Sequence, residues 1–175
     1  RFDILGIIDN KFYGNDAGKL LDGKHRNIPI YKSLLSFLNL SINIDYCIIG
    51  VASAGGVLPE EMRSDIILSL KNNISIVNGL HSFLEDDLEI SEIAKINNTK
   101  LYDIRKPRER DLLSFWSGKI NQVKCPKIVV MGTDCGLGKR TTAKLIVENL
   151  RKNSFKSEMI FTGQTGWMQG WKFGF

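Results

Sequence analysis

The chain alternates short apolar runs with longer stretches in which apolar residues recur every three or four positions. The short runs are bounded by polar or turn-forming residues and predict extended or buried strands, at 2–8, 28–30, 44–51, 74–77 and 100–104. Helical spacing lies between these runs and predicts helices over 31–40, after Pro59, and in broken form over 83–96. Residues 14–23 show neither pattern, so we expect a turn-rich loop there.

Strands and helices that alternate in this way predict a parallel sheet covered on both faces. We therefore expect an α/β fold, with a Rossmann-like parallel-sheet domain over 1–105 and a second α/β unit over 123–175. Residues 106–122 are expected to be a linker, because they are rich in charge and contain Pro107 and Gly118. A parallel sheet needs several strands, so 123–175 is expected to be the truncated start of a P-loop NTPase-like domain.

The most informative stretch is glycine-rich and lies between an apolar run that predicts a strand, 127–131, and a segment with helical spacing, 143–152. Glycines let consecutive main-chain N–H groups turn toward one anion, a lysine adds a mobile charge, and a helix N-terminus adds a partial positive charge. We expect a phosphate-binding loop, hereafter the phosphate loop, made of Gly132, Thr133, Asp134, Cys135, Gly136, Leu137, Gly138, Lys139, Arg140, Thr141 and Thr142. An ordinary strand-to-helix turn is the alternative, and it explains the lysine and the hydroxyls poorly.

The phosphate loop departs from the common P-loop pattern at two points. Five residues, rather than four, separate Gly132 from Gly138, and this longer spacing resembles the Gly-Thr-Asp variant found in dethiobiotin synthetase and its P-loop relatives. Arg140 stands where Ser or Thr usually follows the lysine. A Mg²⁺ ion would therefore take its hydroxyl ligand from Thr141 or Thr142. The presence of Arg140 in place of a hydroxyl favours simple phosphate binding over nucleotide hydrolysis.

A second polar segment, 162–170, follows the apolar run 159–161. In a P-loop sheet the end of this strand lies near the bound phosphate, and Gln164 offers an amide that can stabilise an oxyanion. Two roles are open for Asp134, that of the base and that of orienting the loop or a magnesium-bound water, and the orienting role is favoured. Gly163 and Gly166 allow tight turning, and an ordinary turn is the alternative for the segment as a whole.

Charge and composition exclude some classes of function. The chain has 175 residues and a net charge of +5, which suits an anionic small ligand. The basic cluster 105–110 contains a glutamate and no interleaved aromatic residue, so we expect a solvated loop and no nucleic-acid partner. Apolar runs are far shorter than a membrane span, and no signal peptide is evident, so we expect a cytoplasmic protein without a membrane partner. A homo-oligomer is compatible with the sequence, although no residue demonstrates one.

The remaining polar candidates lie where strands of the first domain end. Ligands of open parallel sheets bind beyond the carboxyl ends of the strands, and the segments that follow them here are 9–11, 52–56, 78–81 and 105–106. Asp9 has two interpretations, a ribose-binding carboxylate or a turn residue that accepts main-chain N–H groups, and the second is favoured. His81 is interpreted as a packed or capping residue in preference to a catalytic one.

Several of these stretches belong to one larger pattern, and together they span nearly the whole chain. They are 6–9, 16–18, 21–24, 49–52, 78–81, 103–107, 132–135, 138–139 and 162–166. Taken together they resemble the DgcN family of D-glutamate N-acetyltransferases. The specific part of the resemblance is the combination of Gly-Thr-Asp-Cys at 132–135 with Thr-Gly-Gln-Thr-Gly at 162–166.

The resemblance implies a Rossmann-like N-terminal domain, a P-loop C-terminal domain, and transfer of an acetyl group from acetyl-CoA to the amine of D-glutamate or another D-amino acid. Coenzyme A carries a diphosphate and a 3′-phosphate, which Lys139, Arg140 and the N–H groups of the phosphate loop would bind. Two alternatives remain open: an ATP- and Mg²⁺-dependent enzyme of the dethiobiotin-synthetase kind, and a nucleotide-binding regulatory module without catalysis.

Overall fold

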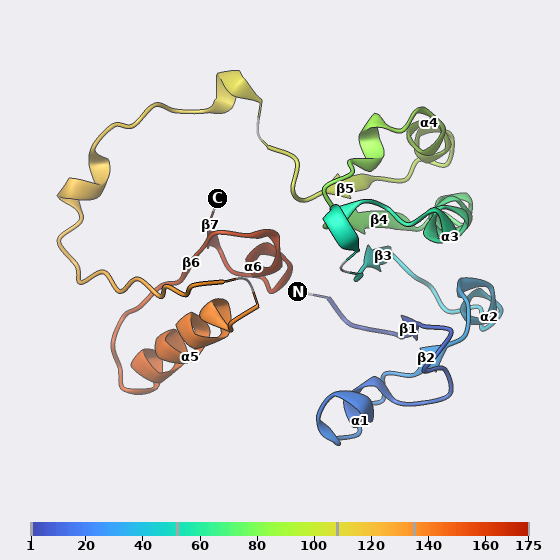
Figure 1. The fold of residues 1–175 in the computed structure, drawn as a ribbon, viewed down its shortest axis with the longest axis horizontal. Coiled ribbons are helices and arrows are strands. Elements are labelled where there is room, and N and C mark those ends of the chain that lie inside the picture. Colours follow the sequence, from blue (N-terminus) through green and yellow to red (C-terminus); the bar gives the residue numbers. More distant parts are fainter. Residues whose placement is uncertain (1, 52, 108, 135, 175) are drawn as a thin grey trace. The chain divides into compact units, whose positions relative to one another are not determined.

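The computed structural model describes residues 2–51, 53–107, 109–134 and 136–174 (Figure 1). Contacts between these residues divide the chain into two compact units, Phe2–Lys106 and Pro107–Phe175. Within the described residues no helix combines the length and the apolar character that crossing a bilayer requires.

The first unit is built from parallel strands that alternate with helices (Figure 1). Its elements are β1 (Ile7–Ile8), α1 (Ala17–Asp22), β2 (Ile30–Tyr31), α2 (Leu34–Leu38), β3 (Tyr46–Ile49), α3 (Glu60–Lys71), β4 (Ser75–Asn78), α4 (Leu88–Ile96) and β5 (Leu101–Asp103). The strands β1 and β2 form a parallel pair, and β3, β4 and β5 form a parallel sheet in that order. Short 3₁₀ turns lie at Ala54–Gly56 and Leu84–Asp86.

The core of the first unit lies between the three-stranded sheet and the helices α3 and α4. Ile76 of β4, Leu70 of α3 and Ile90 of α4 are fully buried in one cluster. The ends of the helices are defined by their sequence: Pro59 precedes the first turn of α3, and Asp87 caps α4 by accepting the N–H of Ile90. Burial of this apolar cluster is the main source of stability for the unit.

The predicted strands at 44–51, 74–77 and 100–104 and the broken helix at 83–96 are confirmed, with shorter bounds. The prediction of a loop over 14–23 is wrong, because α1 occupies Ala17–Asp22. Asp16 starts this helix by accepting the N–H groups of Gly18 and Lys19, and Gly23 ends it in the left-handed conformation. The strand predicted over 2–8 is only Ile7–Ile8, which is as far as its pairing with β2 extends.

The second unit contains α5 (Lys139–Lys152), β6 (Ile160–Phe161), α6 (Gln164–Met168) and β7 (Phe173–Gly174), with 3₁₀ turns at Arg110–Leu112 and Lys119–Gln122 (Figure 1). The strands β6 and β7 pair in parallel. A small core of Val147, Met159 and Phe161 joins α5 to β6, and Trp167 and Trp171 pack against it.

One prediction for this unit is wrong, and one alternative interpretation is excluded. Residues 127–131 form no strand, because a strand requires a hydrogen-bonding neighbour and the described residues provide none; Val129 and Met131 are 76% and 84% exposed. The polar segment 162–170 is not a simple turn, because it contains the helix α6. Gly166 has no left-handed backbone conformation there, so its role is not to allow a tight bend.

Candidate functional site

The phosphate loop runs directly into the first turn of the longest helix in the described residues. Gly136 and Gly138 both have left-handed backbone conformations, with φ of 70° and 85°. Only glycine adopts this conformation without steric cost, so the two residues allow the chain to reverse before α5 begins at Lys139. Cys135, which the sequence analysis placed in the loop, lies outside the described residues.

The side chain of Lys139 folds back over the loop that precedes it. Its ammonium group donates a hydrogen bond to the main-chain carbonyl of Asp134. Its aliphatic stem passes close to Gly132, where an added Cβ would lie 3.0 Å from Cδ and 3.1 Å from Cγ of the lysine. The absence of a side chain at Gly132 therefore lets the lysine lie across the loop. This arrangement keeps the positive charge of the lysine at the loop.

The other predicted residues lie on the exposed surface around this turn. Thr133 and Asp134 are exposed in the loop, and Leu137 is 58% exposed. Arg140, Thr141 and Thr142 are exposed on the first turn of α5, where the N–H of Thr142 bonds to the carbonyl of Gly138 at 2.9 Å. That turn contains no acidic residue, so the partial positive charge of the helix N-terminus is not offset there.

Gln164 is the first residue of α6 and is half-buried. The position of this helix depends on the close packing of two glycines, Gly166 and Gly174, against the ring of Phe161. A Cβ at Gly166 or at Gly174 would overlap the side chain of Phe161. The residue Trp167 of α6 and Ala143 of α5 pack against the same apolar cluster. The helix that carries Gln164 is therefore fixed to the helix that follows the phosphate loop.

The unit that holds the phosphate loop is strongly basic. Residues 107–175 contain twelve Lys and Arg against five Asp and Glu, whereas residues 1–106 contain twelve against fourteen. The positive charge of the whole chain thus comes from the second unit. Such a field raises the local concentration of anions such as phosphates.

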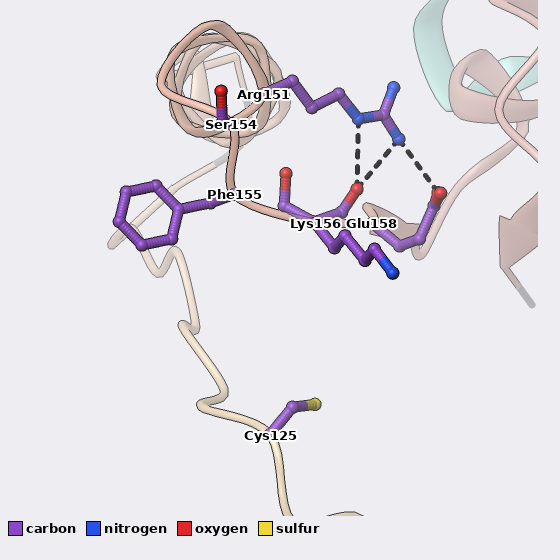
Figure 2. A pocket seen from close by; sticks show the side chains of 7 residues that line it. Cys125, Arg151, Ser154, Phe155, Lys156 and Glu158 are labelled. Carbon is purple, nitrogen blue, oxygen red and sulfur yellow. Dashed lines mark hydrogen bonds and ion pairs between the residues drawn. The ribbon is translucent and has the colours of Figure 1, made fainter.

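A hollow of about 730 Å³ lies elsewhere in this unit, beside the C-terminal end of α5 (Figure 2). Arg151, which lines it, donates hydrogen bonds from Nε and Nη2 to the carbonyl of Ser157 at 3.1 and 2.9 Å and forms an ion pair with Glu158 at 3.1 Å. These bonds hold the turn after the helix. The negative end of the helix dipole disfavours an anion at this position, so we do not assign the phosphate site there.

Two candidates of the first unit have structural roles. The carboxylate of Asp9 accepts the N–H groups of Lys11 and Phe12 at 2.8 and 3.0 Å, which is the turn interpretation. The main-chain N–H of His81 bonds to the carbonyl of Gly56 at 2.8 Å, and its ring packs so closely that a Cβ at Gly56 would overlap it. Packing is therefore confirmed for His81.

Asp16 is a buried residue whose carboxylate accepts several main-chain hydrogen bonds, and the sequence analysis missed this role. Its carboxylate caps α1 and also accepts the N–H groups of Arg26 and Ile28 at 3.0 and 2.8 Å. Burial raises the pKa of Asp16, but the N–H groups of Arg26, Ile28 and Lys19 outweigh it and lower the pKa to about 2. The available signal was an aspartate directly before Ala-Gly-Lys-Leu-Leu, a typical helix start.

The described residues contain no group of three or more His, Cys, Asp or Glu side chains that could hold a metal ion. The phosphate loop offers the groups that could hold an anion, namely the ammonium group of Lys139 and the N-terminus of α5.

Comparisons with known proteins give relatives that match most of the chain. Two D-glutamate N-acetyltransferases are similar to it over 119 residues, which is 68% of this chain. The one from a Pseudoalteromonas species is 31% identical and is covered over 35% of its length; the one from Tritonibacter scottomollicae is 29% identical and covered over 34%. The chain thus spans about a third of the length of these curated relatives.

The fold has a relative among solved structures as well. The crystal structure of a DUF1611 family protein from Anabaena variabilis superposes with a TM-score of 0.80 and 25% identity, over 94% of this chain and 46% of that one. A Rossmann-like domain described as a domain of unknown function, DUF1611_N, matches residues 10–107. A P-loop domain, DUF1611_C, matches residues 114–175. The order and extent of these two matches show that the chain belongs to the DUF1611 family.

Proposed function

We propose that this protein transfers an acetyl group from acetyl-CoA to the amine of a D-amino acid such as D-glutamate, and that the phosphate loop binds the phosphates of the coenzyme. The observation that carries the proposal is the lysine folded across a glycine-rich loop at the start of α5. The names of the two relatives, which are those of D-glutamate N-acetyltransferases, support the choice of reaction. The basic character of the second unit supports an anionic ligand.

Acetyl-CoA supplies an activated thioester, and the residues of this chain would bind it, orient it and handle the proton. Lys139 and the main-chain N–H groups at the start of α5 bind phosphate oxygens, and Arg140 adds a second cation on the first turn. Gln164 donates a hydrogen bond to the oxyanion that forms when the amine attacks the carbonyl. Asp134 accepts the proton that the amine loses as the carbon–sulfur bond breaks and the thiolate leaves.

An ATP-dependent reaction is the second candidate, and the spacing of the glycines favours it. Five residues between Gly132 and Gly138 resemble the loop of dethiobiotin-synthetase-like enzymes. In that case Thr141 would be the hydroxyl ligand of a nucleotide-bound Mg²⁺, because Arg140 stands at the usual position.

The two reactions are distinguished by their ligands and products. The intact protein is titrated with acetyl-CoA and, separately, with ATP and Mg²⁺, while thermal unfolding is followed. A ligand at 100 times its dissociation constant stabilises the folded state by about 2.7 kcal/mol. Incubation with acetyl-CoA and D-glutamate, with L-glutamate as control, is analysed by mass spectrometry for the N-acetylated product.

Stabilisation by acetyl-CoA together with acetylated D-glutamate is the expected result. Consumption of ATP that depends on a small acceptor, without acetyl transfer, would replace the proposal with the ATP-dependent reaction. Tight nucleotide binding without turnover of either kind would identify a regulatory module instead.

A further inference from the structure

Arg151 joins the C-terminal end of α5 to two segments that come later in the second unit. Its Nε and Nη2 atoms donate to the carbonyl of Ser157, before β6, at 3.1 and 2.9 Å (Figure 2). The same guanidinium lies over the ring of Trp171, after α6, with Cζ 5.7 Å from the ring centroid. One side chain therefore contacts both the segment before β6 and the segment after α6.

Trp171 is in turn attached to α6 through its main chain and through its packing. Its N–H donates to the carbonyl of Gly166, in the middle of α6, at 3.2 Å, and its side chain packs against the apolar cluster that contains Phe161. Gly166 is buried and touches the same ring so closely that a Cβ would not fit. A displacement of Trp171 would therefore be passed on to α6, whose first residue is Gln164.

The surroundings of Arg151 suit a geometric role better than an electrostatic one. Glu158 offsets its charge at 3.1 Å, and the C-terminal end of a helix disfavours an anion. The side chain is 46% exposed, so this ion pair contributes little to stability. A planar guanidinium can donate in its plane to a carbonyl while its face covers an aromatic ring, which the ammonium group of a lysine does not reproduce.

We propose that Arg151 is a positioning residue for Gln164 in acetyl transfer, acting through Trp171 and α6 without touching a substrate. The helix α5 carries the phosphate loop at one end and Arg151 at the other, so this contact fixes α6 relative to the helix that follows the donor site. A misplacement of about 1 Å at a reacting centre can cost about 100-fold in rate. The inference rests on the proposed function, because it explains how the oxyanion donor of that reaction is held in place.

The test combines steady-state acetyl transfer from acetyl-CoA to D-glutamate with NMR of the side-chain amide of Gln164, in the intact protein and below its unfolding temperature. The amide signals are identified by their loss in Gln164→Ala. Arg151→Ala removes both contacts, and Arg151→Lys keeps a cation but loses the planar fork; the second also serves if the first does not fold. Lys152→Ala is the matched control, because it removes the neighbouring exposed cation on the last turn of α5. A double variant, Arg151→Ala with Gln164→Ala, shows whether the two residues act as a unit.

We expect Arg151→Ala to lower kcat about tenfold or more, to leave KM for acetyl-CoA nearly unchanged, and to shift the amide signals of Gln164. Arg151→Lys should lose less, and Lys152→Ala hardly anything. In the double variant kcat should fall no further than in Gln164→Ala alone, because both changes remove the same donor.

Two results would overturn the inference and leave the proposed function intact: losses in kcat that multiply in the double variant, or Gln164 amide signals that do not move in Arg151→Ala and Arg151→Lys. Signals that shift in a protein that acetylates no D-amino acid would overturn the proposed function and leave the coupling between Arg151 and Gln164 standing.

Discussion

The ammonium group of Lys139 donates a hydrogen bond to the main-chain carbonyl of Asp134, five residues earlier in the chain. The bond ties the first residue of α5 back to the loop that precedes the helix. A phosphate oxygen is a stronger acceptor than a carbonyl, so a bound phosphate would compete for this donor. The lysine is thus held next to the place where we propose that the ligand binds.

Lys139→Ala should weaken binding of acetyl-CoA at least about tenfold and leave the fold intact. The lysine would supply one charge-assisted hydrogen bond to phosphate, and its hydrogen bond to the protein is with an exposed loop. Isothermal titration measures the affinity, and thermal unfolding measures the stability. Lys152→Ala, which removes an exposed lysine at the other end of α5, is the control. An unfolded variant, or one with full affinity, would contradict the assignment.

Gly132→Ala should weaken binding of acetyl-CoA and change the stability of the fold little. The added Cβ would lie 3.0 Å from Cδ of Lys139, so the lysine stem must move away from the loop. The loop is exposed, and the atom that must move belongs to a flexible side chain, so the fold can absorb the change. Titration with acetyl-CoA is the measurement. Gly50→Ala is the control, because a Cβ there meets no atom within 4 Å; equal affinity in both variants would refute the prediction.

Gln164→Ala should lower kcat for acetyl transfer about 100- to 1000-fold and change KM for acetyl-CoA little, because an oxyanion donor acts mainly in the transition state. Steady-state kinetics with D-glutamate separate the two constants. Gln169→Ala is the control, because Gln169 is an exposed amide just after α6. An effect on KM alone would show that Gln164 serves in binding and not in the chemical step.

Gly166→Ala should destabilise the protein by about 1–3 kcal/mol, because the new methyl group would overlap the Cβ and Cγ atoms of Phe161. Urea unfolding followed by tryptophan fluorescence is the measurement. Gly163→Ala should cost less than about 1 kcal/mol, since its backbone is extended and a Cβ there meets no atom within 4 Å. Similar losses in the two variants would mean that the packing around Phe161 is not tight.

Acid should weaken the first unit through the pair formed by Arg63 and Asp87. The hydrogen bonds from Arg63 lower the pKa of Asp87 from 3.8 to about 2. The folded state therefore binds the proton more weakly than the unfolded state, so the stabilisation is complete above pH 3.8 and is lost as the pH falls toward 2. In Arg63→Met the pKa of Asp87 should rise toward its ordinary value, as measured by NMR titration of the carboxyl group.

The control for this prediction is Lys106→Met, which removes an ion pair of more exposed side chains. Pairs at the surface contribute little, so acid unfolding of this variant should stay close to that of the unmodified protein. An Asp87 pKa that does not change in Arg63→Met would show that the N–H of Ile90 alone keeps this carboxyl ionised.

The sequence predicted best those elements whose partners lie within the described residues. The runs at 44–51, 74–77 and 100–104 pair with one another, so their apolar pattern was sufficient. Residues 127–131 have an equally apolar pattern, yet no neighbouring strand is described to pair with them. The helix at Ala17–Asp22 was missed because its stability depends on the Asp16 carboxylate and on distant main-chain groups at 26 and 28, which periodicity does not reveal.

The sequence predicted the loop of the candidate site and the helix that follows it, but not how the side chains of the site pack. Glycines followed by a lysine indicated a reversal of the chain and a helix start, and both are present at 136–139. The sequence could not show that Lys139 lies across Gly132, because such contacts depend on three-dimensional proximity. For the same reason Gly166 was interpreted through its backbone freedom, although its role is to leave room for Phe161.

The packing of Phe161 between two glycines has a consequence for how this family can vary. Side chains at positions 161, 166 and 174 would occupy the same space, so the three positions should change together in evolution. A homologue with a β-carbon at 166 or 174 is expected to carry a smaller residue at 161, and lineages that keep the phenyl ring should keep both glycines.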